Sequence, residues 1–172
     1  MMKRALLCMS LCVAGAMFLG TTLAQAQKSK STVAFERLSS LVGEWKGIQD
    51  GIDITLTYTL TANGSALMEE FRPAQGAVMM TIFSVDGDHL IATHYCAAGN
   101  QPHMATPKIT DPQNKALAFS LVRVTGMATP EDWHNTGLEV QLEDKDHLTQ
   151  TWTYLYKGKA GTTVFHFTRK QA

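Results

Sequence analysis

Hydrophobic and polar residues alternate strictly over residues 52–61, where isoleucine, leucine and tyrosine take every second position and mainly threonine lies between them. This period of two predicts a β-strand with one face in a core. Asn63-Gly64 follows, and this pair favours the positive φ angles of a tight hairpin turn. Residues 65–72 form the predicted return strand, so the β region begins with an antiparallel hairpin.

Seven further segments have the same β-prone character, and turns such as Asp86-Gly87 separate several of them. They are residues 43–49, 78–85, 89–97, 116–124, 137–143, 148–157 and 162–170. An antiparallel up-and-down sheet of nine strands leaves exposed edges unless it closes on itself. We therefore expect an all-β, up-and-down antiparallel barrel of eight to ten strands. A two-sheet sandwich is the alternative architecture.

One segment has helical periodicity instead. The spacing of Phe35, Leu38 and Leu41 predicts a short N-terminal helix over about residues 33–41, with Thr32 as its cap. Two long connections interrupt the strands, residues 98–115 with three prolines and residues 125–135. Loops of this length in a compact domain are often functional.

The first 26 residues have the pattern of a secretory signal peptide. A basic start, Met1–Arg4, precedes the uncharged residues 5–23, and Ala24-Gln25-Ala26 is the small-x-small pattern of a cleavage site. We predict cleavage after Ala26, one barrel domain over residues 27–172, and a periplasmic or secreted location. The alternative is a retained membrane anchor, because an uncharged stretch of this length just spans a bilayer. The favoured interpretation leaves no membrane span in the mature chain.

Cleavage changes the composition that matters for function. The whole chain has 172 residues with 15 basic and 15 acidic side chains, and removal of 26 residues leaves 146. Lys3 and Arg4 leave with the peptide, so the net charge becomes −2. A balanced charge without a basic block argues against a nucleic-acid partner. Cys8 and Cys12 also leave, so Cys96 is the only thiol and no intramolecular disulfide forms.

Polar residues concentrate around the end of the strand at 89–97 and in the two long loops. His94 and Cys96 are two residues apart on this strand, so their side chains share a face. The candidate ligand-binding residues are His94, Cys96, Asn100, Gln101, His103, His134 and Glu70. We predict that they orient a small apolar or amphipathic ligand at one barrel mouth. If Glu70 faces inward it needs a partner such as Arg72, because a buried unpaired charge is costly.

The same residues allow other interpretations. Histidine and thiolate suit zinc or copper, but the spacing matches no zinc motif. A Cys96 nucleophile needs a hydrogen bond to His94, whereas side chains two apart on a strand are separated by about 7 Å. A purely structural role is the fourth reading, with Cys96 as a small buried apolar residue. Binding without a metal, cofactor or catalysed reaction is the favoured hypothesis.

Gly43-Glu44-Trp45 follows the predicted helix and resembles the Gly-x-Trp signature of the lipocalins. This resemblance implies that Trp45 closes one barrel end and that an arginine of the last strand, here Arg169, packs over its ring. Residues 93–104, 146–152 and 165–169 resemble motifs of bacterial exported proteins with a lipocalin-like domain of unknown function. That resemblance covers nearly all of residues 35–170 and implies the fold, while activity does not follow from fold.

A haem-binding barrel is the alternative function. Residues 43–47, Gly-Glu-Trp-Lys-Gly, are similar to the opening of the nitrobindin-like ten-stranded barrels, which implies haem held by a late histidine. His166 is the only histidine in the late strands. It alternates with Phe165 and Phe167, so inward-facing phenylalanines would place His166 toward solvent.

Overall fold

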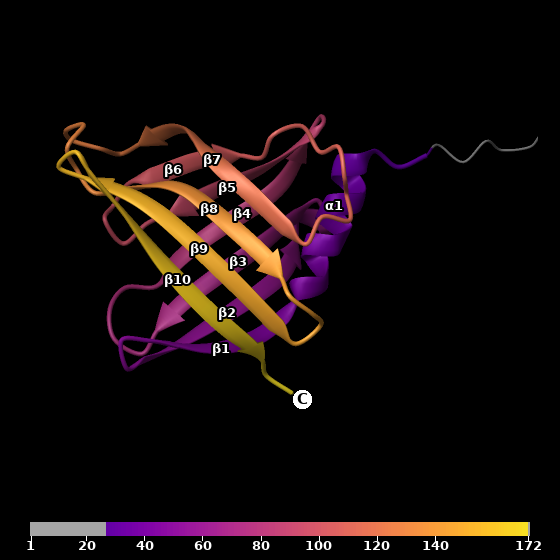
Figure 1. Cartoon of the computed structure of the whole chain (residues 1–172), viewed down its shortest axis with the longest axis horizontal. Coiled ribbons are helices and arrows are strands. Elements are labelled where there is room, and N and C mark those ends of the chain that lie inside the picture. Colours follow the sequence, from indigo (N-terminus) through magenta and orange to yellow (C-terminus); the bar gives the residue numbers. More distant parts are fainter. Residues whose placement is uncertain (1–26, 172) are drawn as a thin grey trace, which may run out of the picture.

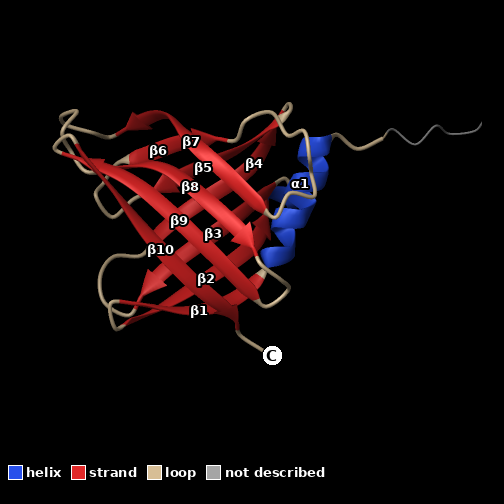
Figure 2. Ribbon diagram, viewed as in Figure 1, coloured by secondary structure: helices blue, strands red, loops and turns tan. Residues whose placement is uncertain are grey.

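The computed structural model describes residues 27–171, which form a ten-stranded β-barrel with one helix at its end (Figures 1 and 2). The elements are α1 (Lys30–Leu38), the 3₁₀ turn η1 (Ser39–Leu41), β1 (Gly43–Gln49), β2 (Ile52–Thr61), η2 (Ala62–Gly64), β3 (Ala66–Pro73), β4 (Met79–Asp86), β5 (His89–Tyr95), β6 (Gln101–Ala105), β7 (Ala116–Thr125), β8 (His134–Leu142), β9 (His147–Tyr156) and β10 (Lys159–Arg169). The signal peptide predicted over residues 1–26 lies outside the described residues.

Each strand pairs antiparallel with the next one in sequence, and β1 pairs with β10 to close the sheet. Closure gives every strand two neighbours, which removes the exposed edges that an open sheet would have. The predicted class, an up-and-down lipocalin-like barrel with a short N-terminal helix, is therefore confirmed, with ten strands. The sandwich alternative is wrong, because the strands form one continuous closed sheet.

The alternation in the sequence sets which side chains fill the barrel. On β2, Ile54, Leu56 and Tyr58 are buried in the lumen, and the intervening threonines lie on the outer face. The same parity puts Phe167 inside and His166 outside on β10. Near the α1 end, fully buried leucines, Phe83, Met104 and Trp45 fill the lumen.

Helix α1 closes one end of the barrel. Phe35 and Leu38 are buried, and the Ser31 hydroxyl donates to the Gly87 carbonyl in the β4–β5 turn at 2.6 Å. Trp45 is fully buried and its indole N–H donates to the Leu41 carbonyl at 2.8 Å. The Arg169 guanidinium lies 4.1 Å from the Trp45 ring centroid. No helix within residues 27–171 is long and apolar enough to cross a membrane.

Three local predictions need correction. The helix begins at Lys30 with Ser29 as its cap, because the Ser29 hydroxyl accepts from the Thr32 N–H, and Ser39–Leu41 is a 3₁₀ turn. The predicted loop 98–115 contains β6, which pairs with both β5 and β7 despite Pro102. The turn after β2 is a four-residue connection over residues 62–65, longer than a two-residue hairpin loop.

Candidate functional site

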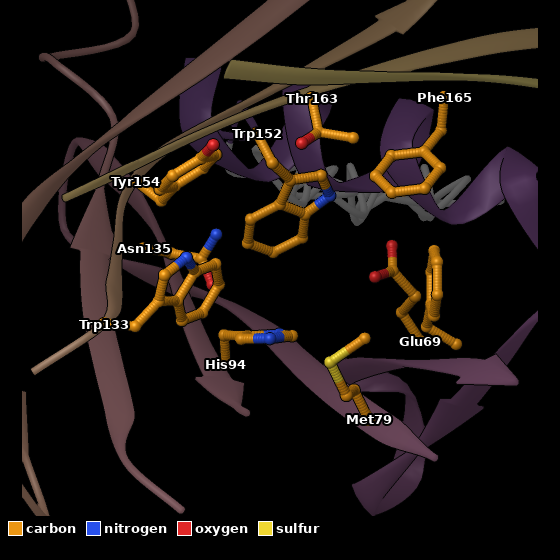
Figure 3. A pocket seen from close by; sticks show the side chains of 10 residues that line it. Glu69, Met79, His94, Trp133, Asn135, Trp152, Tyr154, Thr163 and Phe165 are labelled. Carbon is orange, nitrogen blue, oxygen red and sulfur yellow. The ribbon is translucent and has the colours of Figure 1, made fainter. Parts of the chain in front are cut away.

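A cavity of about 190 Å³ lies in the half of the barrel away from α1. Its lining comes from the middle of β3, the start of β4, the end of β5, the residues around the start of β8, the second half of β9 and the middle of β10. The lining residues are Glu69, Phe71, Met79, His94, Trp133, Asn135, Trp152, Tyr154, Thr163 and Phe165 (Figure 3). Five of the ten carry aromatic rings. An apolar cavity of about 150 Å³ holds benzene, so this one has room for a ring-sized group.

Strand register places a row of polar side chains along one wall. Tyr58 on β2 is paired with Glu69 on β3, Glu69 with Thr81 on β4, and Thr81 with His94 on β5. All four residues are buried, and each belongs to the inward-facing set of its strand. The row therefore follows directly from antiparallel pairing of neighbouring strands, since paired residues point to the same face.

Gln150 reaches this row from β9 on the other side of the lumen. Its amide nitrogen donates to Glu69 Oε2 at 2.6 Å and to the Tyr58 hydroxyl at 2.8 Å. The Trp152 indole N–H donates to Gln150 Oε1 at 2.9 Å. Because an indole N–H is only a donor, this contact fixes the amide with its nitrogen toward Glu69.

The Thr81 hydroxyl connects Glu69 to His94. It donates to Glu69 Oε1 at 3.2 Å and lies 3.0 Å from His94 Nδ1. A hydroxyl has one proton, so while Thr81 donates to the carboxylate it accepts from Nδ1–H. In this arrangement Nε2 of His94 carries the lone pair. The His94 ring also packs against Trp152, with ring centroids 4.7 Å apart.

Burial sets the ionisation of both groups. Burial raises the pKa of Glu69, and hydrogen bonds from Tyr58, Gln150 and Thr81 offset part of that rise. Burial lowers the pKa of His94 to about 4, so this imidazole is neutral at physiological pH. The cavity wall thus presents a neutral histidine and a buried carboxyl group held by neutral donors.

Trp133, Tyr154 and Asn135 lie together on one side of the cavity (Figure 3). The Trp133 and Tyr154 rings lie 5.4 Å apart at 31°. Asn100 anchors this corner from the β5–β6 connection, because its amide nitrogen donates to the Trp133 carbonyl at 2.7 Å. Asn135 is buried, and within residues 27–171 its Oδ1 has no hydrogen-bond partner. An unpartnered buried oxygen beside a cavity is unusual and suits a ligand that donates a hydrogen bond.

The structure brings some of the predicted residues to this region. His94 lines the cavity, and Asn100 donates a hydrogen bond to the cavity residue Trp133. His134 is buried next to Trp133 and Asn135 in sequence, with Nδ1 2.8 Å from the Asp132 carbonyl oxygen. These three residues come from β5, the β5–β6 connection and β8, which meet at the same end of the barrel.

The other predicted residues lie elsewhere. Cys96 follows the end of β5 in a turn, where burial raises the pKa of its thiol. Gln101 and His103 belong to the outward set of β6, and both contact the Thr125 hydroxyl. Glu70 is on the outer face of β3 and pairs with exposed Arg72 at 2.8 Å. None of these four residues lines the cavity.

The residues proposed for a metal or haem are also dispersed. His103 and Cys96 do not line the cavity, and His166 is exposed outside β10, 2.9 Å from the Thr149 hydroxyl. Within the part of the chain that the structure describes, no group of three histidine, cysteine or acidic side chains is arranged to hold a metal ion.

Several residues of the site were missed at the sequence level. Glu69 shares the inward parity of Leu67 and Phe71, and Gln150 shares that of Leu148 and Trp152. Strand parity was the signal that identifies both. Asn135 and Trp133 carry no such signal, because their places depend on where β8 begins after a long loop.

Comparison with known proteins extends to the fold alone. The sequence matches no protein-family profile and none of the curated proteins. A solved structure of a protein of unknown function from the DUF3598 family of Nostoc punctiforme is similar, with a TM-score of 0.51 and 17% identity over 77% of this chain. This chain spans 49% of that protein's length. Rv2717c from M. tuberculosis is similar with a TM-score of 0.56 and 12% identity, over 81% of this chain and 98% of that one. At these identities the likeness is one of barrel fold.

Proposed function

We propose that this protein is an exported barrel that binds a small, largely apolar molecule in the cavity opposite α1. The observation that carries the proposal is the cavity itself, which combines five aromatic walls with a few polar groups. Ligand pockets have this composition, because apolar walls supply most of the binding energy and a few polar atoms fix orientation.

The two halves of the barrel interior support this role. Large apolar side chains pack the half near α1, as stability requires. The other half keeps a hollow although Trp133, Trp152 and Tyr154 stand around it. Leaving a cavity costs stability, so a hollow bounded by ordered aromatic rings is consistent with a space kept for a ligand.

The preferred ligand is a ring-sized group rather than a long chain or haem. The volume of about 190 Å³ exceeds the roughly 150 Å³ that holds benzene only modestly. Trp133 and Tyr154 are partly exposed, whereas Trp152 and His94 are buried.

Two neighbouring threonines on β10 provide a matched test. Thr163 lines the cavity, whereas Thr162 is exposed on the outer face. Thr163→Phe fills the hollow, and we expect it to abolish binding of benzyl alcohol and related one-ring probes. Titration calorimetry measures this binding. Thr162→Phe adds the same side chain outside and is expected to bind them normally.

Two results would contradict the proposal. One is wild-type protein that binds no probe and, when purified without unfolding, retains no small molecule by native mass spectrometry. The other is equal binding by the two variants, which would place the ligand outside this cavity.

A further inference from the structure

A buried carboxylate without a cation is the least expected feature of the cavity wall. The Glu69 side chain is 1% exposed. Every ion pair among residues 27–171 involves exposed or partly exposed side chains, and none includes Glu69. Its hydrogen-bond donors, Thr81 and Gln150, are both neutral. Buried charges in proteins are normally paired, because removing a charge from water is costly.

The donors around Glu69 are arranged to bind an ionised carboxylate, while burial raises the pKa of this carboxyl. An ionised carboxylate accepts about four hydrogen bonds, and Thr81 and Gln150 supply two of them. Gln150 is fixed as a donor by Trp152, so it cannot turn its carbonyl toward a protonated Glu69. A cation that enters the cavity would therefore stabilise the ionised form of Glu69, which has acceptor capacity left over for it.

The remaining walls suit a positive charge. The faces of aromatic rings carry negative potential and attract ammonium groups, most strongly for tryptophan. Figure 3 shows Trp152 and Phe165 standing across the space from Glu69, with Trp133 toward one side. His94 adds no positive charge, because its imidazole is neutral, and its Nε2 lone pair can accept an N–H bond.

We propose that the cavity selects a small organic cation, an ammonium group attached to a ring-sized apolar group, and that Glu69 recognises the charge. This inference rests on the proposed function, since it names the class of ligand for the same cavity. The ammonium would pair with Glu69 and donate to His94 while its apolar part packs against the aromatic rings. An anion gains no such charge pair, and beside an ionised Glu69 it would be repelled in a medium of low dielectric constant.

Three probes of nearly equal size separate the possibilities. Benzylamine is a cation at neutral pH, benzyl alcohol is a neutral donor, and benzoate is an anion. Titration calorimetry of the wild-type protein at pH 7.5 is expected to give the order benzylamine, then benzyl alcohol, then benzoate. We expect benzylamine to bind roughly tenfold or more tightly than benzyl alcohol, because it gains a desolvated cation–π contact and a charge pair.

Glu69→Gln is the matched variant, because it keeps the size of the side chain and removes its charge. It is expected to lose the preference for benzylamine over benzyl alcohol while still binding benzyl alcohol. If this variant does not fold, the order of the three probes on the wild-type protein decides the question.

Two outcomes overturn the inference and leave the proposed function standing. They are benzyl alcohol binding as tightly as benzylamine, and a Glu69→Gln variant that keeps the full preference. Failure of all three probes to bind would overturn this inference, and it would overturn the proposed function too if the protein purified without unfolding also retains no small molecule.

Discussion

His94 and Glu69 control what the cavity presents to a ligand, and both depend on a single hydroxyl. Thr81 lies between them, so the tautomer of His94 follows the ionisation of Glu69. Neither side chain reaches bulk water, and the site's chemistry is therefore set by neighbours on adjacent strands.

Burial of neutral His94 makes stability dependent on pH. Its pKa is about 4 in the folded protein and near 6.5 when exposed, so the unfolded chain binds the proton first. The contribution of His94 to the free energy of unfolding is therefore fully present above pH 6.5. It is lost as the pH falls toward 4, and the loss is roughly 2–3 kcal/mol by pH 4.5. The raised pKa of Glu69 acts with the opposite sign and offsets part of this loss.

Urea unfolding at pH 7.5 and 4.5 checks this prediction. Wild type should lose more stability than His94→Gln, which keeps a polar side chain but cannot titrate. Both proteins retain Glu69 and Tyr58, so their difference reports His94. Identical losses would show that His94 is not protected from protonation.

Arg169 joins the first and last strands at the closed end. It donates to the carbonyls of Ser40, Val42 and Lys145 at 2.8–2.9 Å and stacks on Trp45. We expect Arg169→Met to lower the free energy of unfolding by about 2–4 kcal/mol, because three charged hydrogen bonds and a cation–π contact are lost.

Arg72→Met is the control for this loss. Arg72 pairs with Glu70 on the exposed face, and such pairs contribute less than about 1 kcal/mol. Denaturant unfolding measures both. Equal costs would mean that Arg169 does not hold the barrel end closed.

At the scale of elements, α1 covers one end of the barrel. Leu38 is 0% exposed, whereas nearby Val42 is 42% exposed. Leu38→Ala should cost roughly 2–5 kcal/mol through the cavity that it leaves. Val42→Ala should cost less than about 1 kcal/mol in the same unfolding experiment. A small loss for Leu38→Ala would show that the helix is not packed against the barrel.

Most elements could be predicted from the sequence, because period-two alternation specifies both a strand and its buried face. The short strand β6 could not, since five residues with a proline carry no clear period. The turn at residues 62–65 also differs, because Ala62 and Asn63 both adopt positive φ in a longer connection.

The candidate site was only partly predictable for a related reason. The strand position of His94 predicts its place at the site. The predicted residue Glu70 instead lies on the outer face of β3, and the neighbouring Glu69 faces inward. A one-residue change of parity moves a side chain to the opposite face. Cys96 does not share a strand face with His94 as predicted, because β5 ends at Tyr95. The meeting of Asn100 with Trp133 depends on two loops far apart in sequence, which no local pattern reveals.

At the scale of the whole molecule, export is the first step in the proposed role. The signal-peptide pattern predicts cleavage after Ala26, so the mature protein should begin at Gln27. Intact-mass analysis of the protein from the periplasm or medium checks this. A product that retains residues 1–26 would favour the anchor alternative.

The barrel as a whole divides into a packed half under α1 and a hollow half opposite it, and binding at the hollow half is the central claim. The three tryptophans of the chain report on both halves: Trp133 and Trp152 line the cavity, and Trp45 is buried at the closed end. Their indole N–H signals in a ¹⁵N-resolved NMR spectrum therefore provide a test and its control in one sample.

The most direct measurement is this spectrum during titration with benzylamine and, separately, benzyl alcohol. Binding in the cavity predicts saturable shifts of the Trp133 and Trp152 indole signals, while the Trp45 signal stays in place. Shifts confined to Trp45, or no saturable shift of Trp133 and Trp152 with either probe, would contradict a ligand site at the open end of the barrel.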